Sequence, residues 1–185
     1  MNTRLYHISD KPGIERFEPR PVPHPGAGQT GSMVWAIDYE HLPNYLLPRD
    51  CPRVTFFANP NSDPEEVRQL MGGTSAKSVV AIEAVWLPEI QKQCLYRYEF
   101  NPTDFTLVDK IAGYWISRQP VIPIDMIKIE NILAALLEHD IELRIMPFLW
   151  KLREEVIKST LGYSIIRMNK AQPPPEGLSA YHPLP

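Results

Sequence analysis

Cysteine is scarce in this chain, with two residues, Cys51 and Cys94, among 185. They lie far apart in the sequence and match neither a disulfide framework nor a metal-binding knuckle. The histidines likewise show no metal-ligand spacing with one another. We therefore expect a protein of a reducing cytoplasm that binds no metal.

Long apolar runs and a strong net charge are also lacking. No run approaches the roughly 18 residues that a membrane span needs, and the amino terminus has no apolar signal core. The formal net charge is -3, so no overall field would draw the chain to nucleic acid or to an anionic membrane. We expect no membrane association, and a nucleic-acid contact would need arginines gathered on one face.

The familiar catalytic motifs are missing as well. The sequence has no GxxxxGK[ST] loop, no GxGxxG after a strand, no HExxH, no GxSxG and no paired CxxC. These absences exclude assignment by motif to the P-loop, dinucleotide-binding, zinc-protease and serine-hydrolase classes. The function must be argued from scattered residues.

Proline, by contrast, is abundant, with 20 residues against an average usage of about 5%. One group lies in "FEPRPVPHPGAGQTG", which predicts an extended loop because proline interrupts helices and strand ladders. Another marks a tail over residues 172–185, by composition either a ligand for proline-binding modules or an inert end, the interpretation we prefer. Residues 1–171 then form one domain.

Strand patterns dominate that domain. The helix over 64–71 is the most clearly punctuated, with Asp63 as N-cap, Pro64 at its first position and Gly72 as its stop. Apolar spacings of three and four predict further helices within 129–141 and 147–160. Runs of β-branched and aromatic residues predict strands over 5–9, 32–38, 53–57, 78–87, 94–100, 105–109, 113–117, 121–130 and 141–146. With no regular alternation of strand and helix, we expect an α+β fold of mainly antiparallel sheets with inserted and flanking helices.

His7 is the first candidate site residue. In "LYHIS" it shares one face of a strand with Leu5 and Ser9, while Tyr6 and Ile8 share the other. An imidazole in an apolar strand either satisfies its nitrogens within the core or lines a site. Both alternatives stay open from the sequence.

Arginines near strand ends form the second group of candidates. Their guanidinium groups match phosphate oxygens in bidentate geometry, and loops beside a rigid sheet often carry binding residues. The alternative for each is a surface carboxylate or a loop carbonyl. The arginines concerned are Arg20, Arg49, Arg53 and Arg118.

Aromatic residues lie in or beside the same predicted strands and serve either as core or as stacking surface. The residues are Tyr6, Trp35, Tyr45, Tyr114 and Trp115. Cys51 has no base close in sequence, so we do not expect it to be a nucleophile.

Four motifs in order, "LYHIS", "IERFEPRP", "VWAID" and "YWISRQPVIPIDMIKI", resemble the ADP-ribosyltransferase-like superfamily over residues 5–129. The whole chain also resembles a bacterial family known only as a domain of unknown function, through "VWAID" and "PRDCPR". The first resemblance implies a split pair of antiparallel sheets and a cleft that binds NAD or another phosphorylated nucleoside.

Carried over by residue, the superfamily pattern places His7 on the nicotinamide ribose, with Tyr6 and Ser9 beside it and Trp35 on the second strand. Tyr114 falls where active transferases have a glutamate. We therefore expect weak or absent transferase activity, since the reaction needs negative charge near its cationic transition state. The predicted site has His7 and Tyr114 as catalytic residues, and its ligand-binding residues are Tyr6, Ser9, Arg20, Trp35, Arg49, Arg53, Ser117 and Arg118.

Two alternatives stay open. One is a non-catalytic module that uses the same scaffold to hold a small ligand or a protein. The other is an enzyme similar to the relatives that remove a 2′-phosphate from RNA with arginines and histidines. Glu99, Asp109 or Glu142 would be the substitutes for the absent glutamate, and the sequence predicts no oligomeric state.

Overall fold

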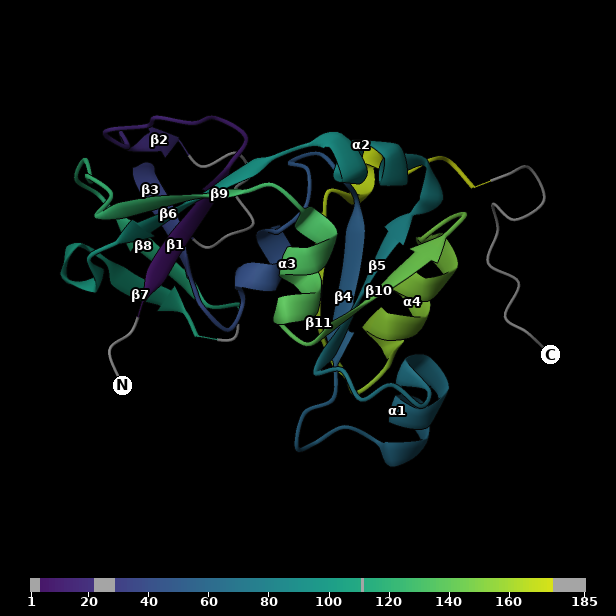
Figure 1. Cartoon of the computed structure of the whole chain (residues 1–185). Helices are drawn as coiled ribbons and strands as arrows, with labels where there is room; N and C mark the ends of the chain where they lie inside the picture. The colour runs from purple at the N-terminus through teal and green to yellow at the C-terminus, as the bar shows by residue number, and fades with distance from the viewer. Residues whose placement is uncertain (1–3, 22–28, 111, 175–185) are drawn as a thin grey trace. The chain divides into compact units, whose positions relative to one another are not determined.

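The structure is a computed structural model that describes residues 4–21, 29–110 and 112–174. The chain divides into two compact units (Figure 1). The first unit contains Met1–Leu46 and Gln93–Ile132, and the second contains Leu47–Lys92 and Leu133–Pro185. Each unit is described by itself. The prediction of a single domain over residues 1–171 stays a prediction.

The first unit is built on an antiparallel sheet of order β7-β8-β3-β1-β6-β9, to which β2 adds by pairing with β3. β1 is central, as expected for a strand of this apolar composition. The strands are β1 (Leu5–Ser9), β2 (Arg20–Pro21), β3 (Ser32–Asp38), β6 (Leu95–Phe100), β7 (Thr106–Asp109), β8 (Tyr114–Ser117) and β9 (Asp125–Ile129).

β1 pairs unequally with its two neighbours. Its ladder with β6 runs from Leu5 to Ser9, whereas its ladder with β3 contains only Leu5↔Asp38 and Tyr6↔Ile37. The second half of β1, from His7 onward, is thus outside the β1–β3 ladder. Most of β1 therefore has no ladder partner in β3.

The core of the first unit covers the face of the sheet that carries Leu5. Phe17 packs there against Tyr98 and Phe100, with ring centroids 5.1 and 5.0 Å apart. The Tyr98 hydroxyl donates to the Lys11 carbonyl and accepts from the Ile14 amide, so it fixes the segment after β1 over this face. The buried residues of the cluster are Leu5, Phe17, Val34, Ala36, Tyr98, Phe100, Phe105 and Val121.

The second unit has its own sheet, of order β10-β5-β4-β11. β4 (Arg53–Phe57) is antiparallel to both β5 (Ser78–Glu83) and β11 (Gly162–Ile166), but β10 (Ile141–Met146) is parallel to β5. There are two sheets, and one pair of strands is parallel because β5 and β10 are joined by a long connection rather than a hairpin.

The helices of the described residues are α1 (Pro64–Met71), α2 (Leu87–Lys92), α3 (Ile132–Glu138) and α4 (Trp150–Lys158). The α1 prediction is confirmed to its caps, since the Asp63 side chain accepts from the Glu65 amide and Gly72 closes the helix with φ 68°. α1 and α4 belong to the unit whose core contains Val54, Phe56, Met71, Val79, Ala81, Leu149, Leu152, Val156 and Leu161.

Two predicted strands are shorter than expected, and β11 was not predicted. The strand expected over 78–87 ends at Glu83, and residues 84–92 form a 3-10 turn and α2 instead. The strand expected over 121–130 begins only at Asp125, because Pro123 lacks the amide that a ladder requires. The α+β class with mainly antiparallel sheets is confirmed. Residues 22–28 of the predicted loop and 175–185 of the predicted tail lie outside the described residues.

Candidate functional site

His7 lies where β1 and β3 stop pairing. Its Nδ1 lies 3.0 Å from the Trp35 carbonyl oxygen, and its ring packs on Phe17 with centroids 5.0 Å apart. In a continued ladder, the Trp35 carbonyl would accept from a backbone amide of β1. The imidazole takes this role instead, while its side chain stays half-buried. The Trp35 carbonyl therefore has a hydrogen-bond partner, and the His7 ring that provides it stays partly exposed.

Arg20 and Arg118 both lie beside the first residues of β3. Arg20 is opposite Met33 in register, and Arg118 donates through Nη1 to the Thr30 carbonyl at 3.0 Å. Both side chains are exposed. Met33 precedes Trp35 by two residues, a rise of about 7 Å along a strand. The two guanidinium-bearing residues thus flank the same stretch of β3 whose carbonyl holds His7.

Trp35 and Tyr114 come together, as the predicted site requires. Their rings meet edge to face with centroids 5.6 Å apart. The Tyr45 hydroxyl donates to the Tyr114 hydroxyl at 2.7 Å, and the two rings are 6.5 Å apart. Tyr45 comes from a short 3-10 turn, Leu42–Tyr45, that follows β3. The three rings form an aromatic cluster whose two hydroxyl groups are bonded to each other.

This aromatic cluster and His7 project from opposite faces of the sheet. Tyr6 opposes Ile37, which in turn opposes Tyr114, so Tyr6 and Tyr114 share one face. His7 follows Tyr6 and is on the other face, because side chains alternate along a strand. The structure therefore separates the two predicted catalytic side chains, His7 and Tyr114, by the thickness of the sheet.

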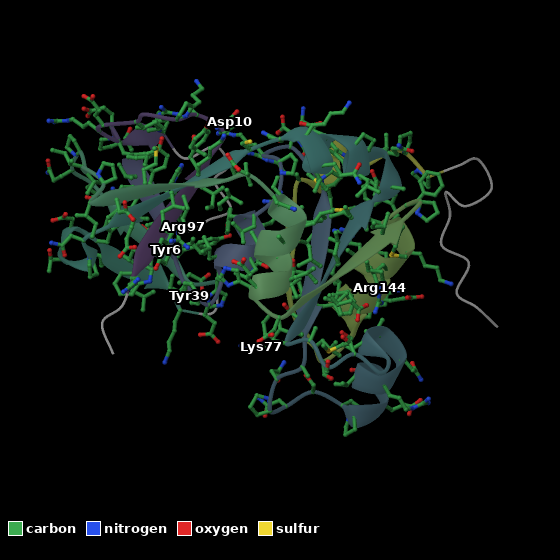
Figure 2. All side chains as sticks on the ribbon, viewed as in Figure 1. Tyr6, Asp10, Tyr39, Lys77, Arg97 and Arg144 are labelled. Carbon is green, nitrogen blue, oxygen red and sulfur yellow. The ribbon has the colours of Figure 1, made fainter. Side chains whose placement is uncertain are left out.

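Tyr6 is itself a core residue, 1% exposed. The Arg97 guanidinium lies over its ring, 5.1 Å from the centroid, and the Tyr39 ring is 6.0 Å away (Figure 2). Burial raises the pKa of the Tyr6 hydroxyl. Ser9 accepts a hydrogen bond from the Lys11 amide. These contacts are all within the protein, and the predicted ligand-binding roles of Tyr6 and Ser9 stay predictions.

The side chains of Ser117 and Arg53 bind backbone carbonyls, whereas Arg49 accepts a hydrogen bond from Arg167 Nε through its backbone carbonyl. Ser117 is buried and its hydroxyl donates to the Gln119 carbonyl. Arg49 and Arg53 belong to the second unit. Arg53 is 2% exposed and donates to the carbonyls of Pro48 and Cys51 at 3.3 and 2.9 Å, while Arg49 is exposed. A buried guanidinium bonded to loop carbonyls has a structural role, which the sequence position of Arg53 did not reveal.

An Asp38–His41 pair was missed by the sequence reasoning. His41 Nδ1 lies 2.7 Å from Asp38 Oδ1, which also accepts from the His41 amide at 3.0 Å. Gly113 makes room for the pair, since a Cβ there would lie 2.3 Å from His41 Nδ1 and 2.7 Å from Asp38 Oδ2. The Asp-x-x-His spacing after a predicted strand is the signal that could have suggested this contact. The pair orients an imidazole beside the start of β8.

The suggested substitute carboxylates are engaged elsewhere. Glu99 lies 3.9 Å from Arg4, and Asp109 accepts from the Ala112 amide. Glu142, in the second unit, pairs with Arg144 at 3.0 Å, and its pKa is lowered by hydrogen bonds from Thr74 and Arg144. Each of the three carboxylates thus has a local partner.

Residues 4–21, 29–110 and 112–174 show neither a metal site nor a membrane-spanning helix. No cluster of three or more histidine, cysteine or acidic side chains could hold a metal ion. No helix in these ranges has the length and apolar character of a membrane span.

No curated protein and no solved structure is similar to the chain at a significant level. A family model matches residues 6–171, which include His7, Trp35, Tyr114 and almost all of both units. The chain therefore belongs to the family described as a family of unknown function, DUF6886.

Proposed function

We propose that the first unit binds NAD or another phosphorylated nucleoside in a cleft of the ADP-ribosyltransferase-like type, beside His7. The observation that carries this proposal is the contact of His7 Nδ1 with the Trp35 carbonyl, 3.0 Å away, at the point where β1 leaves β3. A ring held through one nitrogen has a fixed orientation, and this one keeps part of its surface in solvent. Such a ring is prepared to bind a ribose hydroxyl.

The charges near the start of β3 suit the phosphate part of the ligand. Arg20 and Arg118 are exposed and adjoin Met33 and Thr30. Arginine binds phosphate oxygens in bidentate geometry and stays charged at any physiological pH. Register places Arg20 opposite Met33, on the face of β3 that carries Trp35, whereas His7 is on the other face. A ligand that contacts both residues therefore passes from one face to the other at the point where β1 leaves β3.

Turnover should be weak or absent. Cleavage of the bond between ribose and nicotinamide develops positive charge at the ribose, which a nearby carboxylate stabilises. By the sequence resemblance, Tyr114 corresponds to that carboxylate, and its hydroxyl accepts a hydrogen bond from Tyr45. A neutral phenol cannot replace the charge. The proposal is therefore a nucleotide-binding protein with little or no transferase activity.

The test measures whether the full chain binds NAD, ADP-ribose or inorganic pyrophosphate. Binding is measured by calorimetry and by the shift in thermal unfolding. A ligand at 100 times its Kd raises the free energy of unfolding by about 2.7 kcal/mol. We expect His7→Ala and Arg118→Gln each to weaken NAD binding at least tenfold. Arg16→Gln is the matched control, because Arg16 is an exposed arginine of the same unit that pairs with Glu18 at 2.7 Å.

Two results would contradict the proposal. The first is that none of the three ligands binds to the folded chain. The second is that NAD binds equally well to the His7→Ala, Arg118→Gln and Arg16→Gln variants, which would place the ligand elsewhere. Nicotinamide release is measured in the same samples, and rapid release that depends on His7 would show that the chain is an active transferase without the expected glutamate.

A further inference from the structure

In the second unit, side chains from two elements hold the backbone of Gln172 on both sides. Both carboxylate oxygens of Glu83, at the end of β5, accept from the Gln172 amide, at 3.0 and 3.2 Å. The Trp150 indole, at the start of α4, donates through Nε1 to the Gln172 carbonyl at 2.8 Å. The donor and the acceptor of one residue are therefore both bound by side chains.

Glu83 is completely buried, with 0% exposed surface, which is rare for a carboxylate. A buried carboxylate is costly unless hydrogen bonds compensate it. Burial raises the pKa of Glu83, and backbone hydrogen bonds from Gln172 and Leu149 oppose that rise. The Glu83 side chain is thus positioned to accept hydrogen bonds from backbone amides. β5 and β10 place it next to α4, because Glu83 pairs in register with Met146.

The segment that occupies this position is a short proline-containing stretch, Gln172-Pro173-Pro174. The residue before a proline favours an extended backbone, and successive prolines favour the polyproline II conformation. Proline has no backbone N–H, so Gln172 supplies the one backbone donor of residues 172–174, and Glu83 accepts from it. Aromatic side chains are the usual partners of such segments. The Gln172 side chain takes no part in these backbone contacts.

We propose that Glu83 and Trp150 form a binding site for an extended Xaa-Pro-Pro segment of a partner protein, which residues 172–174 of the chain itself occupy in cis. The site recognises backbone groups, so the first residue can be any amino acid that has an amide. The tethered segment competes at an effective concentration of about millimolar. A partner therefore binds only when it displaces the chain's own segment.

The test uses two full-length variants that differ in one hydrogen-bond donor. Gln172→Pro removes the amide that Glu83 binds, whereas Gln172→Ala keeps it and serves as the matched control. The probe is a fluorescein-labelled peptide with the sequence Ala-Gln-Pro-Pro-Pro-Glu. We expect the peptide to bind Gln172→Pro at least tenfold more tightly than Gln172→Ala. Adding Trp150→Phe should weaken binding about five- to tenfold, since it removes one hydrogen bond and keeps an aromatic ring.

Equal and negligible binding to both variants would overturn the proposal if circular dichroism shows that both are folded. Should Gln172→Pro fail to fold, the native chain decides the question by nuclear magnetic resonance. Millimolar peptide should then shift the Trp150 indole signal, which is assigned by its loss in Trp150→Phe. An unmoved indole signal, or a dimer that forms by exchange of residues 172–174 between two copies, would exclude a partner protein as the occupant.

Discussion

The imidazole of His7 in the first unit is half-buried and contacts one backbone carbonyl through Nδ1, whereas the carboxylate of Glu83 in the second unit is fully buried and receives backbone amides on both oxygens. The first arrangement leaves part of a titratable ring in solvent, where it can meet a ligand. The second uses a buried carboxyl group to hold the chain. The burial of the polar side chain thus separates a candidate ligand contact from an anchoring contact.

A substitution beside the Asp38–His41 pair tests whether the half-buried polar groups of the first unit are packed as tightly as the polar groups of the second unit. We expect Gly113→Ala to lower the free energy of unfolding by about 3 kcal/mol, the largest effect among these predictions. The new Cβ would meet His41 Nδ1 at 2.3 Å, in addition to the strain of a residue with φ 68°. Urea denaturation measures the change.

Gly13→Ala is the control that isolates the strain. Gly13 also belongs to the first unit and has φ 66°, but a Cβ there would meet no atom within 4 Å. The expected loss is about 1 kcal/mol. Equal losses in the two variants would mean that the Asp38–His41 pair moves away at little cost, and that the half-buried groups of the first unit are loosely held.

The second unit can be tested through the pH dependence of its stability. Because burial raises the pKa of Glu83 above its ordinary 4.5, the folded state binds a proton more readily than the unfolded state. The stabilisation is full below the unfolded pKa and is lost as the pH rises through the folded pKa. Relative to Glu83→Gln, which does not titrate, the native chain should therefore lose stability from about pH 4.5 upward.

Urea denaturation of the native chain and of Glu83→Gln at several pH values between about 4 and 7 would show this trend. The opposite slope, with the native chain gaining stability relative to the variant, would mean that the amide bonds of Gln172 and Leu149 outweigh burial. Glu83 would then be a carboxylate held ionised, and the contrast with His7 would be sharper.

Thr55, in the second unit, is a buried polar residue whose hydroxyl has no hydrogen-bond partner among the described residues. Its Oγ1 is buried, and the residue is 2% exposed. Thr55→Val keeps the shape and removes the hydroxyl, so it should raise the free energy of unfolding by about 1 kcal/mol. Ser164→Val, at the opposing position of β11, is a control because Ser164 is only partly buried. A loss of stability in Thr55→Val would imply a bound water at the hydroxyl.

Local signals in the sequence were sufficient for some elements. The α1 boundaries follow from Asp63, Pro64 and Gly72, and the central position of β1 follows from its apolar composition. β11 was missed because Gly162 and Ser164 weaken its strand pattern. The Phe57 ring compensates for the glycine, since it occupies the space where a Cβ of Gly162 would lie. That contact joins residues distant in sequence, which no local pattern contains.

The candidate site was predictable in the same uneven way. Trp35 and Tyr114 were expected together and are neighbours, because both follow strand patterns whose pairing is antiparallel. The opposite orientation of His7 depends on the register between β1 and β3, which the sequence does not specify. The burial of Arg53 depends on the carbonyls of Pro48 and Cys51, and a charged residue in a proline-rich segment gives no sign of it. Tertiary context decided these positions.

The order in which the chain enters its two units has a consequence for biosynthesis. The first unit takes Met1–Leu46, is interrupted by Leu47–Lys92 of the second, and resumes with Gln93–Ile132. On a ribosome, β1 and β3 emerge early but must wait for β6, which supplies the longer ladder of β1. β5 must likewise wait for β10. Neither sheet can therefore be completed before the other has begun, so the nascent chain carries unpaired strand edges through most of its synthesis.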